Sequence, residues 1–471
     1  MSWLYLYTKH KQYRDPRRAV GDAIAKLDPA AADVYKLNNL TASPDDVARF
    51  ISYTIQNNLM SVDDWAAVLD VPGVNPDLAA SILNSPNITT DLATKILNSQ
   101  NITPDQVASI LNSSALDVSK AVSILNSQNI TLNRVISVLT SPFITANRAQ
   151  SILYAMPFNK RLVEILTSGA PNLTLGANMT FSGVNRFSVL NLNGYTYIAD
   201  GNPHVIIANN IVISSTSVLA KTQTGGAGGG FAVYNSVYGA GGAGGGGLII
   251  IVSRLDNAGA ISANGADGMS SSFGVYTSSG TSGDGGPGVF ALVADDQVGT
   301  GGRSNGNKNG GGGGVAYNAP GGMGGGSSII SYATYTDLVE TVKRAAIDWV
   351  LVNVFGKSPT VTAQFINVYG SGGGGGGRHS NSLDGGGGGG GGGGQVIILS
   401  VEFNNSGVVM ADGGRGGSGS SDSGDGGGGG GGVVYVFYKN LLSLGTLRAN
   451  GGAGGPNGQP GTAGTAKAVA I

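Results

Sequence analysis

Residues 60–167 carry a hydrophobic pattern that returns every 14 positions. In each unit an apolar residue precedes a residue suited to capping a helix, and further apolar residues follow four and seven places after that cap. Apolar residues before a cap and four places after it contact each other at many helix starts. The pattern predicts eight short helices joined by connectors, most of them Asn-Ser. The caps are Ser61, Asn75, Thr89, Thr103, Asp117, Thr131, Thr145 and Asn159, all of residue types that favour this position.

These helices are too short to be stable alone in water, so their apolar faces must be buried against neighbouring units. Two of the starts, Ser61 with Asp64 and Thr103 with Gln106, resemble capping boxes, in which two side chains satisfy each other's backbone N–H groups. Stacking of short units that bury a shared core is typical of a solenoid. We therefore expect an all-α short-helix solenoid over residues 60–170.

The period changes to two near Pro171. Phe181–Ile198 and Val205–Ala220 alternate loosely between apolar and small polar residues, as half-buried strands do. Further on, a longer unit recurs, in which a run of glycine leads into an apolar strand, a polar link and a second strand that ends in Ala-Asn-Gly or Ala-Asp-Gly. Its three copies span 244–265, 385–413 and 426–451.

Glycine is distributed unevenly along the chain. Of 82 glycines, seven lie in residues 1–224 and 75 in residues 225–471. Ordering a glycine run costs much conformational entropy, so an ordered run needs bonds to its neighbours. Polyglycine-II helices side by side would supply them, because they have three residues per turn and direct their N–H and C=O groups outward. The alternative is a β-solenoid whose strands are joined by disordered glycine loops.

Together these patterns predict a multidomain α + β protein. Its C-terminal part is a layered repeat of β-strands and polyglycine II, and its N-terminal part is the helical solenoid. A predicted helix interrupts the glycine-rich part, where it would cover an edge of the glycine layer or contact another subunit. The expected divisions are a helical segment 1–59, the helical repeat 60–170, a β-rich connector 171–224, and a glycine-rich domain 225–471 with the helical insertion 336–356.

Composition narrows the classes of function. The 471 residues have a formal net charge of -1, 12% charged residues and no Cys. The near-neutral charge argues against nucleic-acid binding, and the lack of Cys excludes disulfides and thiol chemistry. Apolar runs are as short as single strands, so the sequence predicts neither a membrane span nor a secretory signal peptide.

No catalytic or metal-binding motif stands out. The three histidines, His10, His204 and His379, are far apart and none has a zinc-binding spacing. The acidic residues near glycine do not match the calcium-binding nonapeptide repeat. We therefore predict no enzyme activity, no metal and no cofactor. A polysaccharide hydrolase with paired carboxylates is the enzymatic alternative.

Exposed loops between glycine runs are the candidate binding sites. The loops 231–239, 269–282, 301–317, 378–384 and 418–425 are rich in Tyr, Ser and Asn, the residue types that antibody binding surfaces favour. The alternative is that these loops are polar only because they are exposed. The candidate receptor-binding residues are Tyr234, Tyr238, Tyr276, Arg303, Asn305, Asn307, Tyr317, Arg378 and His379.

Eight asparagines stand in glycosylation sequons, with Ser or Thr two places further on. In the helical part, several of these Thr residues are also predicted helix caps, which is the alternative reason for their presence. The candidates for glycosylation are Asn39, Asn87, Asn101, Asn112, Asn129, Asn172, Asn178 and Asn404.

The runs 244–247, 372–377, 385–394 and 426–432, separated by short strands and loops rich in Tyr, Ser and Asn, resemble the glycine-rich adhesins at the tips of some bacteriophage tail fibres. The resemblance covers about 225–455. It implies a polyglycine-II sandwich whose end loops recognise the host surface, and an N-terminal domain that attaches to the fibre. The helical repeat and the helical insertion depart from that family. Low charge, absence of Cys and abundant sequons also suit a virion protein of an archaeal virus.

The expected function is therefore that of a non-enzymatic virion surface protein, in a fibre or tail tip. Its loops would bind a host cell-surface glycan or protein, and its N-terminal half would contact other virion proteins or serve as a spacer. The rival is a structural capsid-decorating or filament subunit, whose glycine layer packs against copies of itself as a homo-oligomer.

Overall fold

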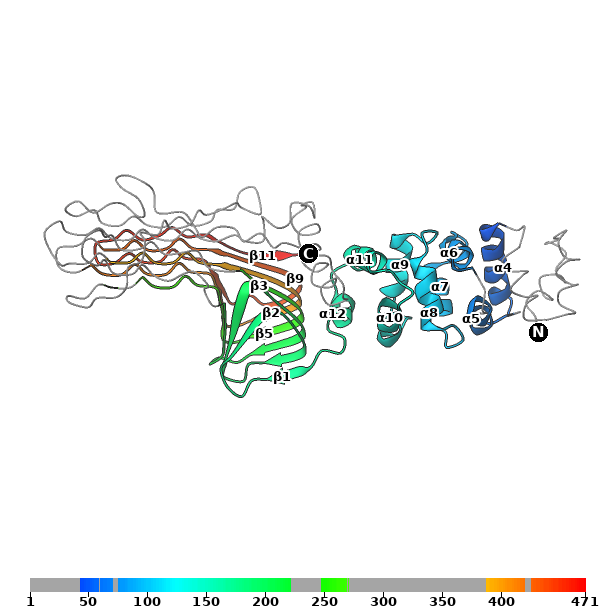
Figure 1. Ribbon diagram of the computed structural model, residues 1–471, viewed down its shortest axis with the longest axis horizontal. Coiled ribbons are helices and arrows are strands. Elements are labelled where there is room, and N and C mark those ends of the chain that lie inside the picture. Colours follow the sequence, from blue (N-terminus) through cyan, green and yellow to red (C-terminus); the bar gives the residue numbers. More distant parts are fainter. Residues whose placement is uncertain are drawn as a thin grey trace, which may run out of the picture. The chain divides into compact units, whose positions relative to one another are not determined.

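The structure is a computed structural model that describes residues 43–58, 60–70, 75–221, 247–268, 270, 387–419 and 425–471 (Figure 1). These residues fall into two compact units, one helical and ending at Ile165, the other a sheet unit that begins at Leu166. The protein is thus mixed α + β, as predicted. The predicted insertion 336–356 and most of the predicted segment 1–59 lie outside the described residues.

The described part of the helical unit consists of nine helices, all short. They are α4 (Pro44–Gln56), α5 (Val62–Asp70), α6 (Pro76–Asn84), α7 (Thr90–Asn98), α8 (Pro104–Asn112), α9 (Val118–Leu125), α10 (Leu132–Leu139), α11 (Ala146–Ala155) and α12 (Lys160–Leu166).

Most of the predicted caps are confirmed by their hydrogen bonds. Ser61 and Asp64 form a reciprocal capping box, since each backbone N–H donates to the other's side chain, at 2.8 and 3.1 Å. The Asp117 side chain makes no cap bond to its own helix. Side chains that accept a backbone N–H in the first turn of their helix are Asn75, Thr89, Thr103, Thr131, Thr145 and Asn159.

Of the two hydrogen bonds in the capping box predicted for Thr103 and Gln106, only one forms. Thr103 Oγ1 accepts the Gln106 N–H, but the Gln106 side chain does not return the bond. Its Nε2 donates instead to the Leu69 carbonyl at the end of α5. The Thr103 N–H donates to the Asp70 carboxylate, 2.7 Å away. A residue 33 places earlier thus caps α8, because α5 ends beside the start of α8.

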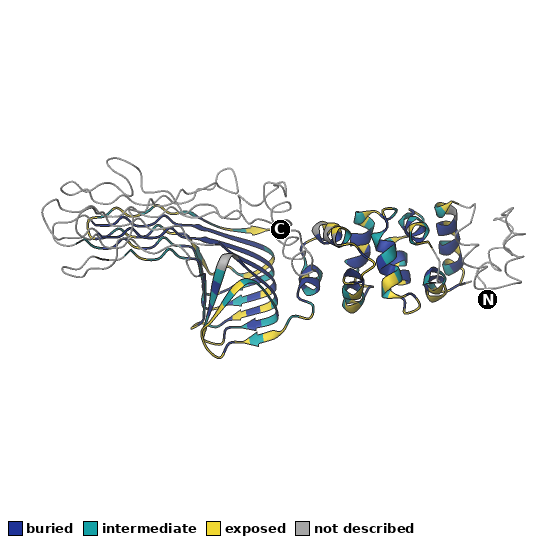
Figure 2. Ribbon diagram, in the orientation of Figure 1, coloured by how far each residue is buried: buried dark blue, intermediate teal, exposed yellow. Residues whose placement is uncertain are grey.

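Helices pack against the helix two places further along the chain, from α4 on α6 to α9 on α11. Polar side chains join connectors across this packing. Arg148 Nε donates to the Leu111 carbonyl at 2.8 Å, and Asn112 Oδ1 accepts the Thr145 N–H at 2.9 Å. Arg148 is partly desolvated there, and this burial lowers the pKa of its guanidinium. The helices also carry buried residues, drawn dark blue in Figure 2, most of which are apolar. Apolar faces and polar connectors therefore both hold neighbouring helices together.

The sheet unit is one sheet of 11 strands, all of whose pairs are parallel. The strand order is β10-β8-β6-β4-β3-β5-β7-β9-β11, with β2 beside β3 and β1 beside β2. The strands are β1 (Asn172–Thr174), β2 (Met179–Asn191), β3 (Thr196–Ile213), β4 (Val218–Lys221), β5 (Gly247–Asn257), β6 (Ala260–Ser262), β7 (Gln395–Asn405), β8 (Val408–Met410), β9 (Val433–Ser443), β10 (Thr446–Arg448) and β11 (Thr465–Ala470).

The order shows that β3 joins two arms of the sheet. On one side, its first part, Thr196–Ala199, pairs with β4 and its later part, His204–Ile213, pairs with β5, while β2 pairs with both parts on the other side. Each later turn of chain adds a long strand to one arm and a short strand to the other. Residues 172–221, predicted to connect two repeats, thus begin the same sheet that the glycine-rich residues continue.

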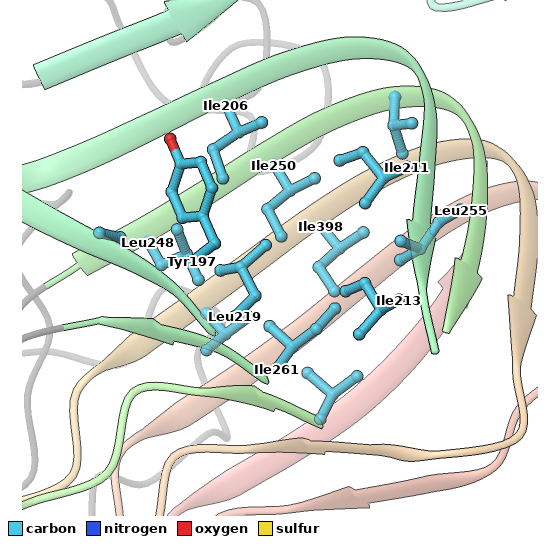
Figure 3. Close-up of a cluster of buried hydrophobic side chains, with 14 of the residues drawn as sticks. Tyr197, Ile206, Ile211, Ile213, Leu219, Leu248, Ile250, Leu255, Ile261 and Ile398 are labelled. Carbon is cyan, nitrogen blue, oxygen red and sulfur yellow. The ribbon is translucent and has the colours of Figure 1, made fainter. Parts of the chain in front are cut away.

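The core of this unit lies between the two arms (Figure 3). Ile250 and Ile398 occupy one register row on the long strands. Leu219 and Ile261 share a row on the short strands. All four are buried in one cluster. Because aliphatic residues stand in register on neighbouring parallel strands, their side chains form continuous rows that fill the space between the arms.

Where β3 passes from one arm to the other, it buries a polar pair. Neither Tyr197 nor His204 is exposed. His204 Nδ1 lies 2.8 Å from the Asp200 carbonyl, which can only accept, so Nδ1 carries the proton and Nε2 accepts from the Tyr197 hydroxyl at 3.0 Å. Burial lowers the pKa of His204, as does the positive charge of the buried Lys221. Burial also raises the pKa of Tyr197.

This pair predicts acid sensitivity. The folded state keeps His204 neutral, whereas the unfolded chain takes up a proton as the pH falls below 6.5. The free energy of unfolding should therefore fall, by at most about 1.4 kcal/mol per pH unit, between pH 6.5 and about 5, where carboxylates begin to titrate. Urea unfolding of the wild type and of His204→Gln over this range tests it. His10 and His379 remain in both proteins, so equal slopes would contradict the assignment.

Candidate functional site: the loop end of the glycine segments

Six glycine-rich segments extend the strands of both arms at the same end. Segments that precede a long strand are g2, g4 and g6, and those that follow a short strand are g1, g3 and g5. They comprise g1 (263–268), g2 (387–394), g3 (411–419), g4 (425–432), g5 (449–455) and g6 (458–464).

Hydrogen bonds between these segments recur every three residues. In g4, every third backbone N–H donates to a carbonyl of g3. The N–H groups of Gly428 and Gly431, each one residue before a donor to g3, donate to g6 instead. Successive N–H groups thus point to different neighbouring segments. The pairs toward g3 are Gly426–Gly417 (2.9 Å), Gly429–Gly414 (2.9 Å) and Gly432–Ala411 (2.8 Å), and those toward g6 are Gly428–Gln459 and Gly431–Thr462 (both 2.9 Å).

The segments lie too close together for side chains between them. A Cβ added to Gly390 would stand 2.0 Å from the Gly414 carbonyl oxygen, and one added to Gly429 would stand 2.0 Å from that of Gly391. These obstacles are backbone atoms, which cannot rotate away. At such positions glycine is required by distance alone, since the backbone φ is not in the left-handed region.

Apart from the first residues of g1, g3, g4 and g5, which are buried, side chains occur where a segment faces outward. Segment g2 is all glycine and wholly buried. In g3 and g5 the third position of each turn carries a side chain, and in g6 only every third residue is glycine. The outward residues are Asp412, Arg415 and Ser418 in g3, Asn450 and Ala453 in g5, and Gln459, Pro460, Thr462 and Ala463 in g6.

The chain reverses direction at the far end of these segments. Segment g1 leads away from the strands and g2 leads back, as do g3 and g4, and g5 and g6. Three connections of very different length, 269–386, 420–424 and 456–457, therefore join the segments at one end. Four of the five predicted polar loops, 269–282, 301–317, 378–384 and 418–425, lie in these connections or overlap them in the sequence.

Asp425 fixes the described part of the loop end. Its side chain is 5% exposed. One carboxylate oxygen accepts the Gly419 N–H at 2.8 Å, which closes the connection 420–424. The other accepts both the backbone N–H and the side-chain amide of Asn457, each at 2.9 Å. A single carboxylate thus ties two neighbouring loops to the same point.

The nine candidate receptor-binding residues, from Tyr234 to His379, all lie outside the described residues. Of the five candidate loops, the structure describes only short parts, chiefly Ser418, Gly419 and Asp425. Asp425 was not among the predicted site residues. The signal for it is its place directly before the run 426–432, which Asp384 shares before the run 385–394.

The sequon asparagines, apart from Asn39 outside the described residues, are all at least partly exposed. Some of their amides are engaged. Asn129 Nδ2 donates to Asp91, and Asn404 Nδ2 donates to Asp256 at 2.8 Å. Asn112 and Asn178 instead use Oδ1 to accept the N–H groups of residues that start later elements.

No family model, curated protein or solved structure matches this chain. Among the described residues, no helix has the length and apolar character needed to cross a bilayer. Nor does this part of the chain contain a cluster of three His, Cys, Asp or Glu side chains that could hold a metal ion. Function must therefore be argued from the glycine segments and their loop end.

The close approach of the segments predicts that Gly390→Ala is strongly destabilising. Its methyl group would push g2 away from the g3 backbone, which should cost about 3 kcal/mol or more. Gly176→Ala is the matched control, because nothing lies within 4 Å of an added Cβ there. Calorimetry should show a lower Tm only for Gly390→Ala. Equal Tm values for the two variants would contradict the packing described above.

The Asp425 clamp predicts a local effect. Asp425→Ala leaves the Gly419 and Asn457 amides without their acceptor, so their hydrogen exchange should quicken by about tenfold, equivalent to about 1.4 kcal/mol of lost protection. The control is Asp267→Ala, which removes an exposed carboxylate that accepts the Arg415 N–H. Unchanged exchange at Gly419 in Asp425→Ala would show that the carboxylate does not hold the loops.

Proposed function

We propose that this chain is a non-enzymatic virion surface protein, in which a rigid glycine-rich unit holds loops that bind a host cell-surface glycan or protein. The observation that carries this proposal is the common loop end. Three connections leave a block of backbone-bonded segments at one end, and a buried carboxylate ties two of them together. Binding loops held by a rigid scaffold lose little entropy when they bind.

The proposal includes polyglycine II as the conformation of the segments. Support comes from the three-residue spacing of the hydrogen bonds and from their division between different neighbours, both of which a threefold helix requires. It also includes a solenoid of 14-residue repeats in the helical unit, supported by the regular spacing of the helix starts and by packing of each helix from α4 to α9 on the second one after it. We assign that unit to attachment on the particle or to spacing.

Segment g6 favours this role over the structural rival. In the structural rival, the glycine layer of one molecule packs against that of another copy. This packing would require the outer face of the last segment to be free of side chains. Instead g6 carries exposed side chains at Gln459, Pro460, Thr462 and Ala463, and retains glycine where it faces g4. These side chains end the lattice on the g6 side.

Adsorption to host cells tests the proposal. The full chain should bind these cells and reduce infection when added before the virus. Replacing 301–317 or 378–384 by Gly-Ser linkers of equal length should abolish both effects. The control replaces the exposed Ser215-Thr216 turn, which lies at the other end of the strands. If both loop variants bound the cells as the wild type does and added protein left infection unchanged, the structural subunit would be favoured instead.

A further inference from the structure

The long strands are buried on both faces where they leave the glycine segments. Along β3, β5, β7 and β9, alternate residues such as Ile250 and Ile398 face the core between the arms (Figure 3). The residues between them point the opposite way, and we name this side of the strands the outer face. Two register rows of the outer face are apolar, and none of their eight side chains is more than 4% exposed. The rows are Val205, Ile249, Ile397 and Tyr435, and Ile207, Ile251, Leu399 and Phe437.

Among the described helices and strands, none covers these two rows. The described elements that contact the long strands extensively are other strands of the same sheet, and the short arm lies across the opposite face, over the core. Further along the same strands the outer face is open, since Arg254 and Glu402 form an ion pair there with side chains 45% and 41% exposed. Lys467 and Val469 on β11, which continue the two rows, are exposed as well. The burial is therefore local, and it must come from chain that packs on β3, β5, β7 and β9.

Unpartnered polar side chains border the apolar rows. Gln395, two residues before Ile397, is fully buried, and neither its Oε1 nor its Nε2 has a hydrogen-bond partner. At the other end of the rows, the buried Ser253 Oγ and Asn209 Oδ1 lack partners too. These are four of the six such atoms in the described parts of the chain. Because a buried polar group without a partner costs stability, we expect the covering chain to bring polar groups of its own to these positions.

The connection 269–386 has chain to spare. The turns that lead from a short strand to the next long strand through g3 and g4, and through g5 and g6, have 22 and 16 residues (411–432 and 449–464). The turn 222–246, between β4 and β5, has 25 and so is of ordinary length. The turn 263–394 has 132. Of the segments outside the described residues, only the one in this turn both begins and ends in the sheet unit and exceeds an ordinary turn.

Both ends of this connection lie side by side at the loop end. A Cβ added to Gly268, at the end of g1, would stand 2.1 Å from the carbonyl oxygen of Gly388, near the start of g2. The eight residues of g2 span about 25 Å in a threefold helix, so about eight extended residues on each side bring the connection to the apolar rows and back. Its apolar run Val289–Ala294 is about 20 Å long when extended, and the four strands span about 14 Å. The connection therefore has both the reach and the apolar residues to cover the outer face.

We propose that the connection 269–386 packs on the outer face of β3, β5, β7 and β9 and forms a second core with the two apolar rows. Polar groups of the connection would pair with Gln395, Ser253 and Asn209. Its loops 301–317 and 378–384 would then stand on a packed base instead of hanging from two glycine segments. This inference concerns the packing of the chain on itself and does not depend on the function proposed above.

Photocrosslinking in the full chain tests this inference. The probe is Tyr435→benzoylphenylalanine, on the outer face, and cross-linked peptides are identified by mass spectrometry. We expect them to come from 269–386. The control is Phe403→benzoylphenylalanine, in the core between the arms, which should capture strands of the sheet unit. Cross-links from position 435 that join two molecules, or that reach only residues 1–165, would overturn the proposal, as would their absence while position 403 cross-links.

Single cysteines measure the cover directly, because the chain has no Cys of its own. Ile397→Cys should react with a maleimide at least about tenfold more slowly than the exposed Glu402→Cys. Replacing 271–386 by the sequence of 419–424 should raise the rate at position 397 by at least about tenfold. Ile398→Cys, which faces the core, should stay protected in both chains and so report that the sheet is folded. An unchanged rate at position 397 in the shortened chain, with position 398 protected, would show that another segment covers this face.

Discussion

The sheet unit depends on how closely its glycine segments approach one another. Carbonyl oxygens of one segment stand about 2 Å from the place where a neighbour's Cβ would be, so the segments bond through their backbones alone. A buried backbone amide without a hydrogen-bond partner costs more free energy than a single hydrogen bond contributes to stability. The segments therefore must keep nearly all of the hydrogen bonds between them. Removal of one glycine disturbs two segments, since each backbone is both donor and acceptor.

The close approach of the segments also fixes the register of the strands, because each segment continues directly from a strand. Parallel rows of Ile, Leu and Val hold the strands in register between the two arms, and each segment continues its strand into the lattice. A one-residue slip would turn the core residues outward and would also move side chains of g3 into the space beside g4. Register is thus enforced twice, by aliphatic packing at one end and by distance at the other.

The loop end gathers the connections of this unit at one place. Connections of different length emerge there from glycine segments that Asp425 ties together.

Local chemistry determined what the sequence could predict. Caps such as Thr89 and Thr131 follow from residue type and spacing, because the bonds they make lie within one turn of the chain. The strands before and after the glycine runs follow from their β-branched, apolar composition. The sequence also contains the pattern of glycine and side-chain-bearing residues in g3 and g6. That pattern can be assigned to inward and outward positions only once the neighbouring segments are known.

Tertiary structure alone decided the contacts between distant residues. Asp70 caps α8 from 33 residues away, and Asn257 donates to Asn405 across 148 residues. The bend that carries β3 between the arms and buries His204 beside Tyr197 has no local signature either. A sequence pattern records which face of an element is apolar or free of side chains. It does not record which element comes to lie against that face, because this depends on the packing of the whole chain.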